Sequence, residues 1–574
     1  MCNASSLGQT VVATHRVWNG VTVKKQLSAF SSLFVLTLLA NSAGGDWPMS
    51  RHDPQRTGVA TGKSNIIAPV PYWRQYLGGE LAAAALMAAD VDGDQARELI
   101  YVTAGRVTVS QPDGTVVWQT DPIGVTTLIA ITDLDGAGGP EVVARSSNQV
   151  YVFAGATGKV QWVEPEGEMG TIAGVRVGDL DGDGVPELVI RECGCCAISG
   201  TSPGVVYSFA AGAAAPKLLW QFPPFGGCSD GNAALVLADV DGIGPREVVS
   251  TIGSTASVFD GSTGSILATS PTPGDASQYD ACAPFNVDGV PGDEIVCIRS
   301  PPLQPADGER KAYVLRYDAG TKKLGVLWSK YLAPYAGGDL RALDPLGDLD
   351  GDGSIELVVS TSAATDVWST RVLDAMTGAE KATLPDRTVA GRLPLGPTKG
   401  SLLLTTSASS TLTAWSYDPA TSPALAFKWT LVDAKGLTFA DPDRMRTAGP
   451  VHWERQITVD LDADGLDDMV VRDVTSSASR VSMWSAAGGQ PMKLGSFEMP
   501  IGVEAARAWN LPPIGASQSR VAVERNDGHL VLLDAKAQPT NAKSALVPGI
   551  RTGGYYETGG WREHQRGPVV GSLD

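Results

Sequence analysis

The sequence predicts an all-β fold, a β-propeller of four-stranded antiparallel blades, and three observations support it. An acidic frame of nine residues recurs seven times between residues 90 and 468. An apolar strand follows the frames, and hairpin-like segments with a glycine turn lie between them. Four-stranded units at intervals of about 45 to 60 residues are typical of propellers, whose blades bury both faces only against their neighbours. We expect eight blades, seven acidic loops and one or two degenerate units.

The first 44 residues predict a signal peptide. Lys24 and Lys25 precede an apolar stretch over residues 27–40, and small residues follow it, as in secretory signals. An uncleaved anchor is the alternative, although the stretch is shorter than the ~20 residues that span a bilayer. The propeller then occupies residues 45–574, and the protein is expected to be secreted or held at the cell surface. No membrane span is expected beyond this segment.

The acidic frame has the same spacing at each occurrence. Aligned on its first residue, it reads DVDGDQARE from Asp90, DLDGAGGPE from Asp133, DLDGDGVPE from Asp179, DVDGIGPRE from Asp239, NVDGVPGDE from Asn286, DLDGDGSIE from Asp348 and DLDADGLDD from Asp460. Like charges packed this closely repel one another unless a positive charge lies among them. Hard cations such as calcium take six to eight oxygen ligands from carboxylates, carbonyls and water. The frame therefore predicts cation-binding loops.

Each position of the frame has a predicted role. Carboxylates at positions 1, 3 and 5 converge on one ion, the carbonyl of position 7 faces it, and the acid at position 9 closes the shell. Glycine at position 6 permits the sharp turn. The logic resembles an EF-hand loop, but β-rich segments such as LVIR and LVVS follow, which indicates strands and not a helix. The alternative for any one reduced loop is an Asx-type turn with solvated carboxylates.

Four loops carry acids at positions 1, 3, 5 and 9, and three have Ala137, Ile243 or Val290 at position 5. We expect four strong calcium sites and up to seven in all. The predicted ligands are Asp90, Asp92, Asp94, Glu98, Asp133, Asp135, Glu141, Asp179, Asp181, Asp183, Glu187, Asp239, Asp241, Glu247, Asn286, Asp288, Glu294, Asp348, Asp350, Asp352, Glu356, Asp460, Asp462, Asp464 and Asp468.

The blades without an acidic frame are predicted from strand pattern alone. One lies near residues 401–431 and another near residues 519–535. The segment near residues 71–77 reads as the last strand of a blade with nothing before it, so we expect it to complete the last blade and close the ring. The C-terminal residues GPVVGSLD read as the start of another acidic loop, which would make the chain a fragment.

Six cysteines remain if Cys2 leaves with the signal, and an even number in an exported protein favours disulfides. Cys282 and Cys297 flank the Asn286 loop at similar distances, and we expect them to be joined. Two disulfides are expected among Cys193, Cys195, Cys196 and Cys228, whose connectivity the sequence leaves open. A soft-metal site at these cysteines is the alternative, which an oxidising compartment opposes.

The net charge and the absence of common catalytic motifs in the sequence limit the classes of partner and reaction that we expect. The formal net charge is -18 and the pI about 4.8, which argues against nucleic acids and anionic membranes as partners. Five scattered histidines form no zinc motif, and no nucleophile signature such as G-x-S-x-G is present, so no catalytic residues are predicted.

The acidic frame before an apolar strand, repeated blade by blade, resembles the FG-GAP or VCBS repeat family, which includes the N-terminal propellers of integrin α subunits. The resemblance covers roughly residues 46–574. It implies an extracellular protein with calcium in these loops that presents the propeller as a binding or adhesion module for glycan or protein ligands. The alternative is a secreted enzyme, either a quinoprotein-type dehydrogenase, which the hairpins GATGKVQW and DAMTG and the adjacent Cys195 and Cys196 resemble, or a calcium-dependent polysaccharide lyase.

Overall fold

The computed structural model separates the chain into two compact units, Met1–Gly44 and Gly45–Asp574. The first, with the predicted signal peptide, lies outside the described residues. In the second, the structure describes residues 86–499 with gaps, and the strands at 59–63, 70–76, 507–511, 520–524, 529–534, 554–557 and 560–563. The gaps are 147, 165–170, 194–203, 214, 224–234, 253–254, 272–277, 301–308, 335–339, 345–346, 365–366, 397–398, 408–410, 433, 438–450, 456–457, 461, 463, 475–478 and 486–488.

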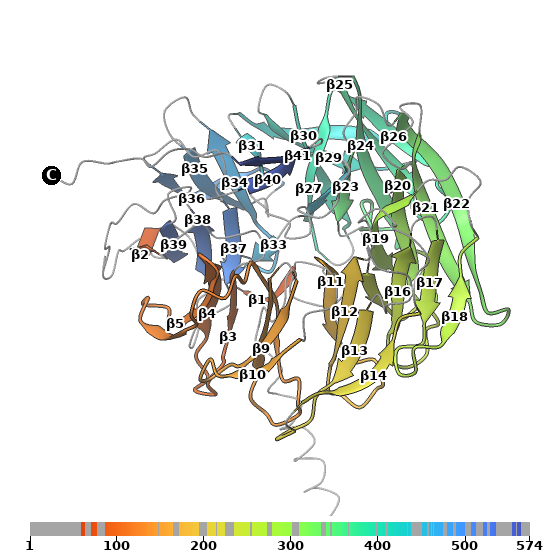
Figure 1. Cartoon of the computed structure of the whole chain (residues 1–574). Helices are drawn as coiled ribbons and strands as arrows, with labels where there is room; N and C mark the ends of the chain where they lie inside the picture. Colours follow the sequence, from red (N-terminus) through yellow and green to blue (C-terminus); the bar gives the residue numbers. More distant parts are fainter. Residues whose placement is uncertain are drawn as a thin grey trace, which may run out of the picture. The chain divides into compact units, whose positions relative to one another are not determined.

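Nine sheets of four or five strands follow one another along the second unit (Figure 1). The first comprises β3 (Leu86–Ala89), β4 (Glu98–Thr103), β5 (Arg106–Ser110) and β6 (Val116–Gln119). The second comprises β7 (Thr127–Thr132), β8 (Glu141–Arg145), β9 (Val150–Ala154) and β10 (Val160–Val163). The third comprises β11 (Thr171–Gly178), β12 (Glu187–Cys193), β13 (Gly204–Ser208) and β14 (Lys217–Gln221).

The next three sheets repeat this order. The fourth comprises β15 (Leu235–Ala238), β16 (Glu247–Ile252), β17 (Thr255–Phe259) and β18 (Ile266–Thr269). The fifth comprises β19 (Gln278–Phe285), β20 (Glu294–Ser300), β21 (Glu309–Asp318) and β22 (Lys323–Pro334). The sixth comprises β23 (Leu340–Asp344), β24 (Glu356–Ala364), β25 (Val367–Asp374) and β26 (Glu380–Pro385), with β32 (Val451–Arg455) parallel to β23.

Three sheets and two strand pairs complete the unit. The seventh sheet comprises β27 (Thr388–Pro394), β28 (Ser401–Thr406), β29 (Leu412–Tyr417) and β30 (Leu425–Leu431). The eighth comprises β31 (Ala434–Leu437), β34 (Met469–Val474), β35 (Ser479–Ser485) and β36 (Met492–Met499). The ninth comprises β37 (Arg507–Leu511), β38 (Arg520–Glu524), β39 (His529–Asp534) and β2 (Val70–Tyr76). The pairs are β1 (Val59–Lys63) with β33 (Thr458–Asp460), and β40 (Gly554–Glu557) with β41 (Gly560–Glu563).

This strand pattern confirms the all-β propeller fold. Eight sheets have four antiparallel strands, and the sixth has the same four strands plus β32. Consecutive sheets contact one another through their first strands, as β7 contacts β11 and β11 contacts β15. Among the described residues no helix is long and apolar enough to cross a membrane.

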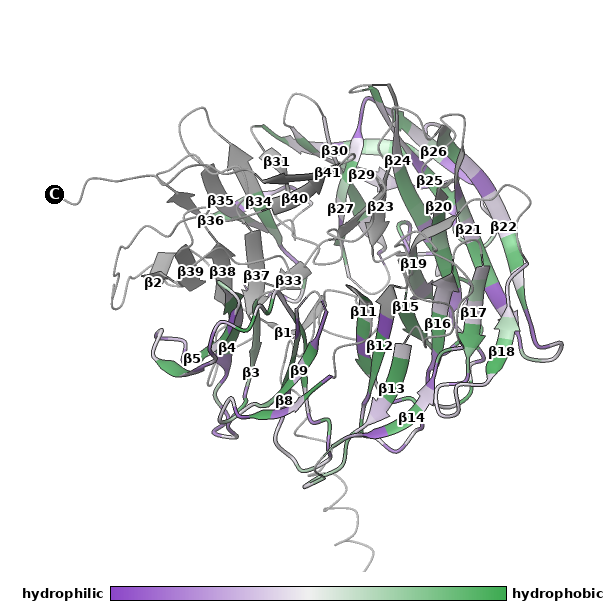
Figure 2. Cartoon of the chain, in the orientation of Figure 1, coloured by the Kyte–Doolittle hydropathy of each residue, from purple (hydrophilic) through white to green (hydrophobic). Residues whose placement is uncertain are grey.

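The second to seventh blades each contribute to a core on either side. The hydrophobic clusters of the described residues each combine side chains from two consecutive sheets. In β8, Val142 packs toward the first sheet and its neighbour Val143 toward the third. Because successive side chains of a strand point to opposite faces, the strand after each acidic loop is apolar at consecutive positions. Figure 2 shows this for β20 and β24.

Tryptophans at the outer strands join neighbouring blades. Trp118 Nε1 donates to Gly155 O at 2.6 Å, Trp220 Nε1 to Gly261 O at 2.7 Å and Trp328 Nε1 to Ala375 O at 2.8 Å. Each ring also lies against a turn glycine of the next hairpin. A Cβ at Gly158, for example, would lie 2.5 Å from the Trp118 ring. The turn glycines of these hairpins therefore make room for the neighbouring tryptophan.

Two pairings join segments that are distant in sequence. β2, which covers the segment near residues 71–77, pairs antiparallel with β39. β33, the strand before the Asp460 loop, pairs in parallel with β1, while β31 takes the place beside β34. The eighth blade therefore departs from the predicted order of strand, acidic loop and strand within one sheet.

Candidate metal centre

Six of the seven acidic frames connect the first and second strands of a blade. Each begins at or near the end of the first strand, and its position-9 glutamate is the first residue of the second strand, as Glu187 is for β12. The two strands pair antiparallel, with Gly178 opposite Glu187 in the third blade. The propeller therefore places equivalent acidic residues at the same end of the first two strands in each of these blades.

The aspartates shape the loop by accepting hydrogen bonds from its backbone. In the Asp179 loop, Asp179 Oδ1 accepts the Gly182 N–H at 2.6 Å and Oδ2 accepts the Gly184 N–H at 3.1 Å. Asp181 Oδ1 accepts the Asp183 N–H at 3.2 Å, and Asp183 Oδ1 accepts the Val185 N–H at 2.7 Å. The Asp90 and Asp348 loops have the same pattern. These Asx-type turns wind the backbone so that several carboxylates gather in one place.

The position-9 glutamate has a second role that the frame did not predict. Its Oε2 accepts the N–H of the residue at position 2, as Glu187 does from Leu180 at 2.7 Å. The same bond occurs in all six loops that join paired strands; the glutamates are Glu98, Glu141, Glu187, Glu247, Glu294 and Glu356. Each glutamate is buried, so it fastens the start of the loop to the second strand.

Carboxylate oxygens converge in five loops. In each of them, one oxygen from each of three acids lies within 4.8 Å of the other two. The groups are Asp90, Asp92 and Asp94; Asp133, Asp135 and Glu141; Asp179, Asp181 and Glu187; Asp239, Asp241 and Glu247; and Asp348, Asp350 and Glu356. Calcium holds its oxygens at about 2.3 to 2.6 Å, so oxygens on opposite sides of one ion are about 5 Å apart. These groups could therefore share a cation.

Convergence does not follow the presence of an acid at position 5. The Asp133 and Asp239 loops have Ala137 and Ile243 there, yet their acids at positions 1, 3 and 9 converge. Asp183 and Asp352, at position 5 of two complete loops, are exposed and lie outside the converging groups. Positions 1, 3 and 9 therefore form the centre of most sites.

The electrostatics of the Asp179 loop indicate unmet negative charge. Burial, reinforced by the nearby aspartates and opposed by the bond from Leu180, raises the pKa of Glu187 from 4.5 to about 7. The second oxygen of Glu187, Oε1, is buried without a hydrogen-bond partner, and no ion pair to Asp179, Asp181 or Glu187 is present among the described residues. Burial likewise raises the pKa of Glu356 to about 8. A cation at the Asp179 loop would supply the partner that Glu187 Oε1 lacks, so the donor set fits a hard metal ion.

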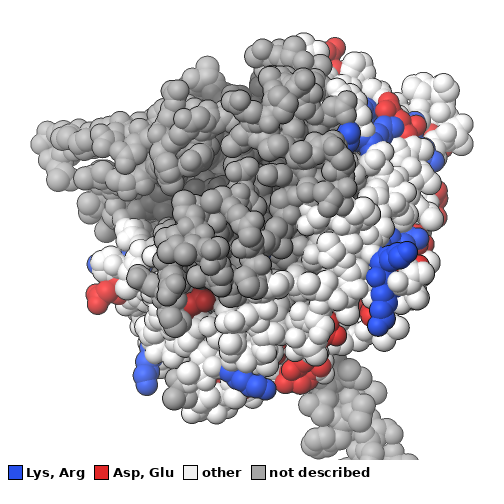
Figure 3. All heavy atoms as spheres, turned by 45° about the vertical axis from the view of Figure 1, so that its right-hand side comes forward, with Lys and Arg blue, Asp and Glu red and all other residues white. Residues whose placement is uncertain are grey.

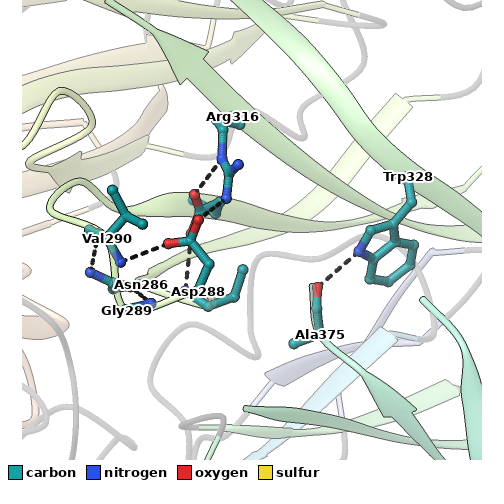
Figure 4. Close-up of polar contacts among 9 residues, drawn as sticks. Asn286, Asp288, Gly289, Val290, Arg316, Trp328 and Ala375 are labelled. Atoms are coloured by element: carbon teal, nitrogen blue, oxygen red, sulfur yellow. Dashed lines mark hydrogen bonds and ion pairs between the residues drawn. The ribbon is translucent and has the colours of Figure 1, made fainter. Parts of the chain in front are cut away.

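The Asn286 loop, which is drawn in Figure 4, differs from the other five because an arginine contacts its acids. Arg316, on β21, donates from Nε to Glu294 Oε1 at 2.8 Å and pairs through Nη2 with Asp288 Oδ2. Asn286 Oδ1 accepts the Gly289 N–H at 2.6 Å, as an aspartate would, but its Nδ2 donates to Val290 O at 2.5 Å. Position 6 here is Pro291, which has no N–H to donate to a second carboxylate oxygen.

The Asp460 loop is described only in part, and the side chain of Asp460 lies outside the described residues. Asp462 Oδ1 accepts the Asp464 N–H at 3.2 Å, and Asp464 Oδ1 accepts the Leu466 N–H at 2.8 Å. Asp468 is fully buried. The second half of this loop therefore has the same turns as the Asp179 loop.

Neighbouring acidic loops also touch one another. Gly242, at position 4 of the Asp239 loop, has φ +72°, and a Cβ there would lie 2.6 Å from the backbone of Pro291 in the next loop. Asp293, beside the frame's closing Glu294, donates its N–H to Asp239 O at 2.6 Å and accepts the Asp239 N–H at 3.3 Å. The Asp239 loop of the fourth blade is therefore hydrogen-bonded to the Asn286 loop of the fifth blade.

Sequence reasoning missed the side chains outside the frame that reach the position-9 glutamate. Gln111 Nε2 donates to Glu98 Oε1 at 3.1 Å, and Gln161 Nε2 donates to Glu141 Oε1 at 3.1 Å. The second and third strands of a blade pair antiparallel, with Leu99 opposite Ser110 and Ile295 opposite Leu315. One residue further along, the same register places Gln111 opposite Glu98 and Arg316 opposite Glu294. An alignment of each hairpin with the acidic loop before it would have identified Gln111 and Arg316 as equivalent positions near the glutamate.

The structure joins one pair of the predicted cysteines. Cys282 and Cys297 are opposite each other on β19 and β20 and form a disulfide. The Cys193 side chain, Cys195, Cys196 and Cys228 lie outside the described residues.

Comparison with protein families gives one match, the FG-GAP-like repeat, over residues 133–190. Residues 133–190 form an FG-GAP-like repeat. The match begins at the first residue of the Asp133 loop, includes the hairpin β9–β10 and the whole Asp179 loop, and ends within β12. One FG-GAP-like repeat therefore takes in two successive acidic frames with the strands between them, and the recognised resemblance is confirmed for this part of the chain.

Several solved structures are similar to this chain over most of its length. The biofilm matrix protein Bap1 of V. cholerae is 14% identical, with 82% of this chain and 91% of that chain covered and a TM-score of 0.41. The quinohemoprotein alcohol dehydrogenase ADHIIG of Pseudomonas putida is 14% identical, with 88% and 82% covered and a TM-score of 0.43. The rhamnogalacturonan lyase PL11 of Bacillus licheniformis is 14% identical, with 83% and 76% covered and a TM-score of 0.40. The comparison with curated proteins gave no match.

Proposed function

We propose that this FG-GAP-repeat propeller is a calcium-stabilised extracellular module that binds glycan or protein ligands. The observation that carries the proposal is the convergence of three acids in each of five loops. In the Asp179 loop the residues that would hold the ion are Asp179, Asp181 and Glu187, with Glu187 Oε1 in need of a partner. The ion supplies positive charge and has no catalytic role in this proposal.

The donor set favours calcium over softer metals. Every converging group consists of carboxylates, and carboxylate oxygens suit calcium, magnesium and manganese, whereas zinc and copper prefer imidazole or thiolate ligands. Calcium tolerates irregular loops and higher coordination numbers, whereas magnesium demands a near-ideal octahedron. Loops with several exposed positions leave room for water to complete the larger shell.

The external location is supported by the signal-like residues 1–44 and by the disulfide between Cys282 and Cys297, since such bonds persist in oxidising compartments. On the face in Figure 3, acidic and basic side chains of the described residues are interspersed among uncharged ones. Such a mixed face is suited to neutral or weakly charged ligands, such as glycans and protein surfaces, more than to a polyanion.

A ligand panel in calcium and in chelator tests this proposal. The full chain would be applied to immobilised glycans and extracellular proteins, with Asp181→Asn as a variant that weakens one cation site. We expect binding that requires calcium and leaves the ligand chemically unchanged. Release of unsaturated sugar products would instead establish the lyase alternative, and identical binding in chelator would contradict the calcium-dependent part of the proposal.

A further inference from the structure

We propose that Arg316 takes the place of a divalent cation in the Asn286 loop, so that the fifth blade closes without metal. The guanidinium of Arg316 bridges the position-3 and position-9 carboxylates, Asp288 and Glu294. In the Asp179 loop the equivalent carboxylates, Asp181 and Glu187, belong to a converging group. This inference rests on the proposed function only where it contrasts the fifth blade with metal-bound loops.

The charges in the Asn286 loop support the replacement of a cation by Arg316. Asp288 and Glu294 have side chains that are 7% and 5% exposed, whereas that of Arg316 is 36% exposed. Carboxylates removed from water need a positive partner, and the planar guanidinium contacts both at once. A calcium ion at the same place would lie beside a fixed positive charge. The residues of the Asn286 loop therefore do not fit a divalent cation.

The first position of the loop also opposes a metal ion. Asn286 is neutral, and its Nδ2 donates to Val290 O, so that an N–H group lies where Asp179 presents its second oxygen to the loop. Val290, at position 5, supplies no carboxylate. The Asn286 loop thus lacks two acids that the Asp179 loop has, and the arginine meets the charge of the acids that remain.

Arginine at this place is specific to the fifth blade among the blades with described acidic loops. The residue opposite the position-9 glutamate is Ala154 in the second blade and Asp374 in the sixth. By the same register it is Ser208 in the third blade and Asp260 in the fourth. The arginine therefore accompanies the one loop whose first position is not an acid.

Counting bound calcium in the full chain and in two matched variants tests the proposal. Asp288→Asn keeps the acceptor for the Val290 N–H but removes the charge, and Asp181→Asn is the equivalent change in the Asp179 loop. We expect Asp288→Asn to leave the number of bound ions unchanged and Asp181→Asn to lose one. Loss of an ion from Asp288→Asn would overturn the proposal.

A double-mutant cycle keeps the inference testable if the chain binds no calcium at all, which would refute the proposed function alone. Arg316→Gln, Asp288→Asn and the double variant would be melted in calcium and in chelator. We expect each single variant to lower the Tm, the double variant to lose less than the sum, and this coupling to be equal in both buffers. Coupling that is absent in chelator, or absent in both buffers, would overturn the role of Arg316.

Discussion

The Asp179 and Asn286 loops have the same nine-residue frame, but within the part of the chain that the structure describes a cationic side chain contacts the acids of the Asn286 loop alone. Both have the buried position-9 glutamate that accepts the N–H of position 2, Glu187 from Leu180 and Glu294 from Val287. In the Asn286 loop Arg316 bridges two acids, and a disulfide joins the flanking strands. In the Asp179 loop a buried carboxylate oxygen has no donor.

The difference teaches that the acidic frame is first a device for turning the chain. Its aspartates accept backbone N–H groups and its glutamate fastens the loop to the next strand, whatever neutralises the remaining charge. The same turn can therefore be completed by a metal ion or by a side chain from the neighbouring hairpin. A frame match alone consequently identifies the turn, whereas residues inside and outside the frame, such as Asn286 and Arg316, determine whether its acids already have a positive partner.

The largest expected effect is the response to chelation, because it would be summed over the five loops whose acids converge. At free calcium about 100-fold above the dissociation constant, each bound ion adds about 2.7 kcal/mol to the free energy of unfolding. The Asn286 loop, which we propose binds no ion, should lose no such stabilisation in chelator. We expect backbone amides of residues 179–187 to exchange hydrogen much faster in chelator, and those of residues 286–294 to change little. Hydrogen exchange with mass spectrometry measures both in one sample, and equal acceleration would erase the contrast.

Removal of the disulfide should weaken the fifth blade specifically. Cys282 and Cys297 are separated by 15 residues, and a loop of that size corresponds to about 3 kcal/mol in the chain-entropy model. We expect the double variant Cys282→Ala, Cys297→Ala to unfold at a lower urea concentration, with a free energy of unfolding reduced by about 3 kcal/mol. Its calcium content should equal that of the parent chain, and a change in content would link the disulfide to a cation site.

The effect of Glu187→Gln on the free energy of unfolding should have opposite signs in chelator and in calcium. Burial raises the pKa of Glu187 to about 7 in the absence of metal, so the charged form is unfavourable in the folded protein. At pH 8 we expect the glutamine variant to be more stable than the parent in chelator, by on the order of 2 kcal/mol, and less stable in calcium, where the ion needs the charge. Urea unfolding in both buffers measures this. Glu294→Gln removes one of the two carboxylates that Arg316 contacts and should be destabilising in both buffers.

The same groups predict a pH dependence. Glu187 and Glu356 have folded-state pKa values of about 7 and about 8 against an ordinary value of 4.5, so in chelator the folded state binds protons more tightly than the unfolded state. The free energy of unfolding should therefore be highest below about pH 4.5 as far as these groups are concerned, and fall as the pH rises to about 8. In saturating calcium this fall should disappear, because the ion binds the deprotonated form. Unfolding curves at several pH values test the sign.

Much of the fold could be predicted from the sequence because its signals are local. The frame from Asp179 to Glu187 specifies a turn between two strands, and the apolar run after it indicates a strand buried on both faces. Two features were not local. Arg316 reaches Glu294 from the next strand of the sheet, and β33 pairs with β1 instead of its own blade. Both depend on strand register, which the frame does not encode. The bond from the Leu180 amide to Glu187 lies within the frame, but the residue types of the frame do not specify it.

The smallest expected effect concerns the contact between loops. Gly184 has φ +88° and open space around its Cβ position, whereas Gly242 has φ +72° and the Pro291 backbone at 2.6 Å. Gly184→Ala should cost about 1 kcal/mol from backbone strain. Gly242→Ala should cost more, because the Asp239 and Asn286 loops must separate. Thermal melts of both variants make the comparison, and equal losses would show that the two loops are not coupled at this glycine.

The most direct test is a crystal structure of the full chain grown in calcium, with anomalous scattering recorded at long wavelength to locate the ions. The account predicts calcium peaks among the acids of the Asp90, Asp133, Asp179, Asp239 and Asp348 loops, and the Arg316 guanidinium in contact with Asp288 with no peak between them. A calcium peak beside Asp288, or an Asp179 loop without an ion at saturating calcium, would contradict it.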